Sequence, residues 1–277
     1  MTTIDLTHLK TTYQIQGTGP DVLWISGGGG RADDWHEHYT SEFGDAYRSV
    51  SFDNRGTTGT VCRQPGPWSI GDMANDAAEL IETVCDAPAV VIGHSMGALI
   101  MLQLALDRPD LVTLGVSLAG AARGDVGWAG DYMRAEIALR RQGIRLPVDF
   151  MAVHNAALMY PGHALQDQAF WQELRGQLTS PAVHENNEDT VLSQWQACLD
   201  FNVTSRLAAL RTPLEVVAFA EDVCAPPAYS AELARLAPGA RYHELPGLGH
   251  ASLFGHRPEV VAGFLRELLD GHFRRRG

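Results

Sequence analysis

Short apolar runs alternate with amphipathic stretches along most of this chain. Their length and their β-branched or aromatic content predict strands at residues 11–15, 22–25, 47–52, 89–92, 111–118, 214–219 and 241–245. Apolar residues at helical spacing predict helices at residues 34–43, 72–84, 98–106, 228–236 and 258–269. Strands that alternate with helices predict an α/β fold built on a doubly wound, mostly parallel sheet.

This alternation stops between residues 124 and 207. The stretch instead has the spacing of four amphipathic helices, at residues 132–141, 148–159, 166–178 and 190–201. We therefore predict an α/β core made of residues 1–123 and 208–277, interrupted by a helical lid at residues 124–207.

Composition narrows the class of partner. The 277 residues carry a net charge of −12, from 21 basic and 33 acidic side chains, which disfavours nucleic acid and anionic membranes as partners. The first residues lack the apolar core of a signal peptide, and no run approaches 18 apolar residues. We expect a cytoplasmic protein that acts on a small molecule; a homo-oligomer is compatible with the sequence.

The numbers and positions of lysines and cysteines limit the catalytic mechanisms and the metal or disulfide sites that the chain can have. The one lysine, Lys10, lies near the N-terminus, so a Schiff-base mechanism on an internal lysine is excluded. The four cysteines are widely separated and form no C-x-x-C pair. A structural zinc site and a disulfide scaffold are therefore disfavoured, and we expect no metal and no cofactor.

The segment Gly93-His94-Ser95-Met96-Gly97 lies between a predicted strand and a predicted helix. Glycines two residues to either side of Ser95 allow a sharp turn in which no larger side chain would fit. Such a turn raises the serine hydroxyl out of the sheet and leaves the N–H of Met96 free at a helix N-terminus. It predicts a nucleophile together with part of an oxyanion site.

Two further polar residues follow later strands. Asp222 comes shortly after the strand at 214–219, and His250 shortly after the strand at 241–245. The carboxyl ends of parallel strands meet at one edge of a sheet, and the chain order Ser, Asp, His is the order expected for G-x-S-x-G on such a sheet. We expect His250 to act as the general base and Asp222 to orient it, with Glu221 as the alternative acid.

With these motifs the chain resembles the lidded α/β-hydrolase superfamily, and within it the small bacterial esterases, enol-lactonases and cofactor-free haloperoxidases. The matching stretches are residues 24–35, 52–60, 93–97, 219–226 and 246–259. The resemblance implies oxyanion donors at the backbone N–H groups of Met96 and Gly28. It also implies hydrolysis of a carboxylic ester or lactone through an acyl-enzyme.

Large apolar groups in the predicted lid suggest the nature of the substrate. We expect Gly29 and some of these side chains to line a pocket for a largely apolar acyl or aromatic group: Trp128, Tyr132, Phe150, Met151 and Met159. Arginines also lie in or beside the lid, at positions 123, 134, 140, 141 and 145. These arginines are predicted to lie on solvated helix faces, with recognition of a substrate carboxylate as the alternative.

Three other functions remain open. The fold also supports non-hydrolytic catalysis (C–C bond cleavage, cyclisation or acyl transfer), or a small-molecule receptor. Residues 27–32 fit the dinucleotide pattern G-x-G-x-x-A, and Asp53 ends the next predicted strand, as in an NAD(P)-binding oxidoreductase. That function leaves Ser95, Asp222 and His250 unexplained, so we interpret Asp53 as an ion-pair partner of Arg55.

Overall fold

A nine-stranded mixed sheet runs through the centre of the protein. The computed structural model describes residues 1–275 except 58, 87 and 181–187. The strands are β1 (Thr2–Asp5), β2 (Leu9–Gln16), β3 (Asp21–Ile25), β4 (Arg48–Phe52), β5 (Val61–Cys62), β6 (Ala89–His94), β7 (Val112–Leu118), β8 (Leu214–Phe219) and β9 (Arg241–Leu245).

The strand order confirms the predicted doubly wound, mostly parallel sheet. Along the sheet the order is β1-β2-β4-β3-β6-β7-β8-β9, with β5 paired to β2. All pairs from β4 to β9 are parallel, whereas β1, β2 and β5 form an antiparallel margin. The order reverses beside β3 and β6, where the crossovers switch faces, and clefts form at such a switch point.

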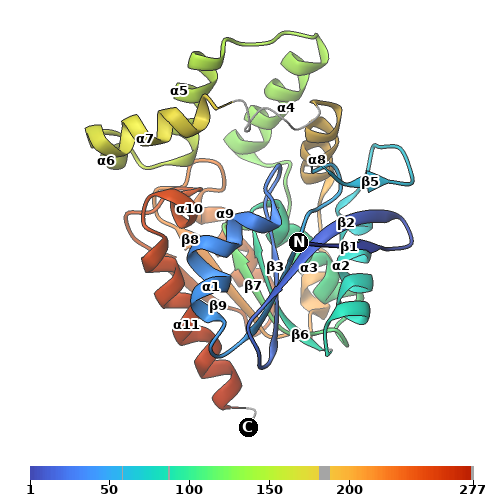
Figure 1. The fold of residues 1–277 in the computed structure, drawn as a ribbon. Helices are drawn as coiled ribbons and strands as arrows, with labels where there is room; N and C mark the ends of the chain where they lie inside the picture. Colours follow the sequence, from blue (N-terminus) through green and yellow to red (C-terminus); the bar gives the residue numbers. More distant parts are fainter. Residues whose placement is uncertain (58, 87, 181–187, 276–277) are drawn as a thin grey trace.

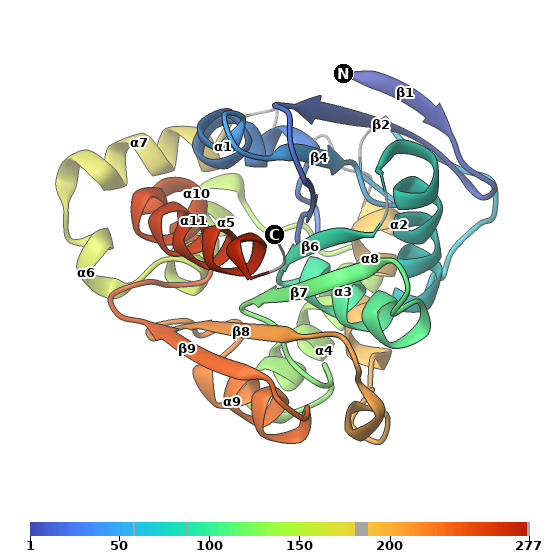
Figure 2. The same ribbon diagram turned by 90° about the horizontal axis from the view of Figure 1, so that it is seen from below.

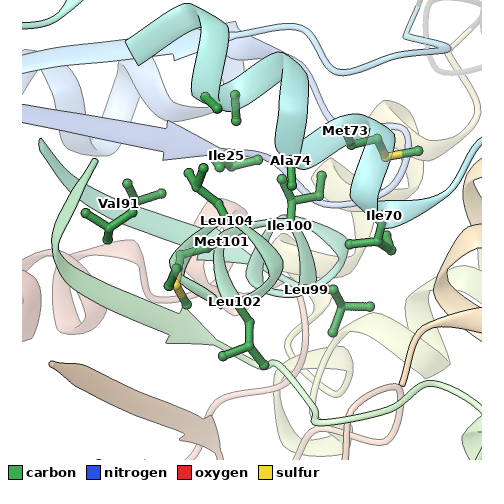
Figure 3. Packing of buried hydrophobic residues seen from close by; sticks show 14 of the residues in the cluster. Ile25, Ile70, Met73, Ala74, Val91, Leu99, Ile100, Met101, Leu102 and Leu104 are labelled. Atoms are coloured by element: carbon green, nitrogen blue, oxygen red, sulfur yellow. The ribbon is translucent and has the colours of Figure 1, made fainter. Parts of the chain in front are cut away.

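Helices cover both faces of the sheet (Figures 1 and 2). The core helices are η1 (Ala32–Trp35), η2 (His36–Thr40), α1 (Ser41–Phe43), α2 (Ile70–Val84), α3 (Met96–Asp107), η4 (Leu207–Ala209), α9 (Pro227–Leu236), α10 (Ser252–Gly255) and α11 (Pro258–Arg274). Because side chains alternate along a strand, Leu23 and Ile25 pack with α2 and α3, as Figure 3 shows around Ile25. Val22 and Trp24 pack on the other face with α1 and α11.

Between β7 and β8 the chain forms a run of helices, α4 (Gly127–Arg141), α5 (Val148–Met159), α6 (Gly162–Leu165), α7 (Gln168–Leu178) and α8 (Glu188–Asp200). We call this run the helical insert. It lies above one end of the sheet in Figure 1, and α8 returns to pack against α3 and α4. Residues 181–187 of the predicted lid lie outside the described residues, and its boundaries at 124 and 207 stay a prediction.

Several boundaries differ from the sequence predictions for identifiable reasons. The predicted helix at 34–43 is three short pieces of 3₁₀, π and α geometry, η1, η2 and α1. The helix predicted at 166–178 begins two residues later, as α7 at Gln168. The Asp167 carboxylate accepts hydrogen bonds from the N–H groups of Ala169 and Phe170, and it therefore caps the N-terminus of α7. Strand β1 was not predicted, because its residues are mostly polar and exposed.

Candidate active site

Ser95 lies at a sharp turn between β6 and α3. Its φ of 53° is in the left-handed region, and its N–H donates to the carbonyl of Leu118 on β7 at 2.9 Å. A Cβ on Gly93 would lie 2.1 Å from the carbonyl oxygen of Gly97, and one on Gly97 would lie 2.1 Å from that of Ile25. Both positions therefore require glycine, and they hold the serine in its strained conformation.

Asp222, His250 and Ser95 form one hydrogen-bonded row. Nδ1 of His250 lies 2.6 Å from Oδ2 of Asp222, and its Nε2 lies 2.9 Å from Oγ of Ser95. Asp222 is 3% exposed and His250 is 7% exposed. The other oxygen of Asp222, Oδ1, accepts from the N–H of Ala225 at 2.7 Å. The structure thus brings together the three side chains singled out from the sequence, whose catalytic roles stay a prediction.

Glu221, the alternative acid, pairs with His163 and not with His250. Its carboxylate lies 3.3 Å from Nδ1 of His163, and both side chains are about half exposed. Cys224 lines the same cavity as Ser95. Burial, followed by the charge of Asp222, raises the pKa of the Cys224 thiol to about 12. The thiol is therefore protonated near neutral pH, and it is a poor competing nucleophile.

His94, the neighbour of Ser95, supports the loop that carries His250. Its Nε2 lies 2.9 Å from the carbonyl oxygen of His250, and the two rings are 4.9 Å apart. A carbonyl oxygen only accepts, so Nε2 of His94 carries the hydrogen. Burial, followed by the charge of His250, holds the pKa of His94 well below its usual range. His94 is therefore a neutral ring that fixes the backbone of His250.

The glycine loop that follows β3 lies beside Ser95. Among the described residues, the N–H groups of Gly28 and Met96 have no hydrogen-bond acceptor. The N–H of Gly29, in contrast, donates to Oε1 of Gln194 at 2.9 Å. Gly28 and Met96 thus offer unused donors at the predicted oxyanion site, while Gly29 holds the loop in place.

A cavity of about 500 Å³ opens onto Ser95 and His250. Among the predicted substrate-contacting residues, Gly29, Tyr132 and Met159 line it. Further apolar groups line it too, namely Leu99, Met133, Leu178, Trp195, Tyr229 and Phe254. The cavity walls come from both the core and the helical insert, and they are mainly apolar.

The other three predicted lid residues lie elsewhere. Trp128, Phe150 and Met151 are not among the described residues that line the cavity. Trp128 is 52% exposed and stacks on Tyr132, and Phe150 is 55% exposed and stacks on His154. Helical spacing located these helices but did not show which of their faces turns toward Ser95.

The helical insert is hydrogen-bonded to all three loops of the site. Gln194 on α8 accepts from Gly29 of the glycine loop. The carbonyl of Met159, at the end of α5, accepts from the N–H of Ala251 at 2.8 Å, next to His250. The thiol of Cys224, two residues after Asp222, lies 3.4 Å from the carbonyl of Leu158. Gln194 and Trp195 were missed because a glutamine and a tryptophan on a predicted helix carry no distinctive signal.

The expected ion pair between Asp53 and Arg55 is wrong. Arg55 instead forms a buried pair with Asp76 on α2, joined by two hydrogen bonds. The Asp53 carboxylate accepts from the N–H of Ala32 at 2.8 Å and from the hydroxyl of Thr12 at 2.6 Å. Asp53 is 3% exposed, and its two oxygens bind the loop and β2, so the carboxylate is buried in a structural role rather than presented to a ribose.

Comparison with known proteins agrees with this fold. Residues 22–264 match the family model described as "Alpha/beta hydrolase family". The chain belongs to the α/β-hydrolase family. Within the described residues, no helix is both long and apolar enough to cross a membrane, and no cluster of three or more His, Cys, Asp or Glu side chains could hold a metal.

Three similar proteins illustrate the range of the family. "Putative non-heme bromoperoxidase BpoC" of Mycobacterium tuberculosis is 33% identical over 91% of this chain and 95% of its own, and its crystal structure superposes with a TM-score of 0.84. "Putative carbamate hydrolase RutD" of Variovorax paradoxus is 27% identical over 93% of this chain and 94% of its own. The enol-lactonase of Burkholderia xenovorans shares the fold, with a TM-score of 0.83 at 20% identity over 97% of this chain and all of its own.

Proposed function

We propose that this protein is a serine hydrolase that cleaves a carboxylic ester or lactone of a small, largely apolar substrate. The observation that carries the proposal is the row from Ser95 Oγ through the His250 ring to the Asp222 carboxylate, with separations of 2.9 and 2.6 Å. The names of the carbamate hydrolase and enol-lactonase relatives, which refer to acyl compounds, also favour it.

In the first half-reaction, His250 Nε2 takes the proton from Ser95 while Oγ attacks the substrate carbonyl carbon. The carbonyl π electrons move to oxygen, and the N–H groups of Met96 and Gly28 stabilise the resulting oxyanion. The tetrahedral intermediate then collapses, breaking the bond to the alkoxy oxygen. That oxygen takes the proton from His250, leaving an acyl-enzyme on Ser95.

In the second half-reaction, His250 takes a proton from water, whose oxygen attacks the acyl carbon. Collapse of this intermediate returns the electron pair and the proton to Ser95, and it releases the carboxylic acid. Asp222 accepts from Nδ1 throughout, which holds the useful tautomer and stabilises the imidazolium that forms in each half-reaction.

The helical insert acts in this proposal as a lid over the substrate. Tyr132, Met133 and Met159 line the cavity from α4 and α5, and Trp195 lines it from α8. A cavity of about 500 Å³ with mainly apolar walls suits an acyl group of modest size.

Fluorophosphonate labelling with peptide mapping tests the nucleophile, paired with turnover of p-nitrophenyl esters. We expect the probe on Ser95, measurable ester hydrolysis, and neither in Ser95→Ala. Labelling that persists in Ser95→Ala would disprove the assignment, and so would a wild-type protein that neither labels nor turns over any acyl ester.

A further inference from the structure

An arginine lines the cavity that contains Ser95. Arg123 lies in the segment between β7 and α4, on the cavity wall. Its backbone is held against the segment that follows α8, because Arg123 bridges to Asn202 and the N–H of Gly124 donates to the carbonyl of Phe201 at 3.0 Å. A Cβ on Gly124 would lie 1.9 Å from the carbonyl oxygen of Cys198, so the two segments are in close contact. The position of Arg123 is therefore fixed by the fold.

Among the described residues, the guanidinium of Arg123 has no counter-charge. Its Nε is buried and has no hydrogen-bond partner, and no ion pair within the described part of the chain includes it. Arg140, the other arginine on the cavity wall, has its Nε 3.4 Å from Glu136 and its guanidinium 4.9 Å from the centre of the Trp195 ring. Asp34 is the carboxylate among the described residues that line the cavity, and it accepts from the N–H of Arg31 at 2.7 Å rather than pairing with Arg123.

A guanidinium does not lose its proton in a protein, so Arg123 keeps a positive charge beside mainly apolar walls. A charge partly withdrawn from water without a partner is unfavourable, and a ligand carboxylate offers two oxygens that match the planar fork. Arg140 is paired with Glu136, whereas Arg123 has no such partner among the described residues, so a ligand that brings a negative charge to Arg123 is favoured.

We propose that Arg123 binds a free carboxylate of the substrate. This inference rests on the proposed function and narrows it: the substrate is an ester or lactone that bears a second, unesterified carboxyl group. The scissile carbonyl would lie at Ser95, while the free carboxylate lies at Arg123 within the same cavity.

Paired esters test the proposal. The monoethyl esters of succinic, glutaric and adipic acid are each compared with the neutral ethyl ester of the same chain length, with acid release followed in a pH-stat. We expect a higher kcat/KM for the acidic member of at least one pair. Arg123→Met should lower that preference by about 10- to 100-fold, mainly through KM, since a hydrogen-bonded charge pair is lost.

Two variants serve as controls. Arg134→Met removes an exposed arginine of α4, paired with Asp131 at 2.7 Å, and should leave the preference unchanged. Arg123→Lys keeps the charge without the fork and should retain part of the preference, which provides a readout if Arg123→Met folds poorly.

Two results would overturn the proposal: a wild-type protein that prefers the neutral ester at every chain length, or a folded Arg123→Met protein with an unchanged preference. Failure of the proposed function is distinguishable, because the uncharged fluorophosphonate would then leave Ser95 unlabelled. Labelling of Ser95 without any preference for acidic esters would refute only the role of Arg123.

Discussion

Oε1 of Gln194 accepts a hydrogen bond from the backbone N–H of Gly29 at 2.9 Å, across 165 positions of the sequence. Nε2 of the same side chain donates to the carbonyl of Arg55 at 2.6 Å, and Arg55 is itself paired with the buried Asp76. The glycine loop is thus tied through one buried amide to both α8 and the core. We infer that Gln194 is a positioning residue for the oxyanion site.

Gln194→Met should lower kcat about tenfold with little change in KM, because the loop that carries Gly28 loses one of its anchors while the cavity keeps its shape. Removal of a direct oxyanion donor costs more, about 10²- to 10³-fold. Binding of a trifluoromethyl ketone, which forms an oxyanion on Ser95, should weaken by a similar factor. Gln196→Met, which alters a side chain bonded to Arg141 and Asp200, is the matched control. Unchanged kcat and unchanged inhibitor binding in folded Gln194→Met would refute the positioning role.

The variants Asp222→Asn and Glu221→Gln show which of the two adjacent carboxylates orients His250. Asp222→Asn should reduce kcat by about 10³- to 10⁴-fold, as expected when an amide favours the wrong histidine tautomer. Glu221→Gln should remain within about twofold of wild type, since the one ion pair of its carboxylate among the described residues is with His163. Steady-state ester kinetics give the comparison, and a larger loss in Glu221→Gln would reassign the acid.

The stability of the protein should depend on pH through His94. Its pKa is depressed in the folded state, so the unfolded chain binds a proton more readily. The contribution of His94 to the stability is therefore fully present above the unfolded pKa of about 6.5, and it declines as the pH falls below that value toward the folded pKa. Urea unfolding at several pH values should show a shallower decline in His94→Gln than in wild type. His36→Gln, at an exposed position on η2, should retain the wild-type slope, and equal slopes in all three proteins would contradict this account.

Gly97→Ala should destabilise the protein by about 3 kcal/mol or more, because the new methyl group meets the backbone of β3 rather than a side chain that can move. Gly263→Ala, in α11, is the matched control: a Cβ there meets no atom within 4 Å. It should be neutral or stabilising by about 0.5–1 kcal/mol, since alanine favours a helix over glycine. Urea unfolding measures both, and a similar loss at the two positions would refute the steric argument.

The sequence predicted the sheet and the three polar side chains because both depend on local signals. The bounds of β8 and β9 agree with the predicted strands, and Ser95, Asp222 and His250 each follow the end of a strand. Residues that follow parallel strands lie at the same edge of the sheet, so the prediction of a parallel sheet also predicted that these three residues lie close together.

Other features depend on contacts between distant segments and were not predictable in this way. The partner of Arg55 is Asp76, on the next helix, although Asp53 is nearer in sequence. Trp128 and Phe150 had the apolar character expected of a substrate pocket, yet they lie on outward faces of α4 and α5. The orientation of a helix about its own axis is decided by what it packs against, and the sequence alone did not identify those partners.

The three hydrogen bonds between the helical insert and the loops of the site bear on how this protein can be re-engineered. Gln194, Met159 and Leu158 supply the acceptors from the insert side. A chimera that takes residues 124–207 from another family member would exchange the substrate pocket and also remove the side chain that anchors Gly29. Transplanted inserts should therefore need a glutamine at the position of Gln194 to preserve the turnover rate, so changes in specificity are easier to make on the cavity walls than by exchange of the whole segment.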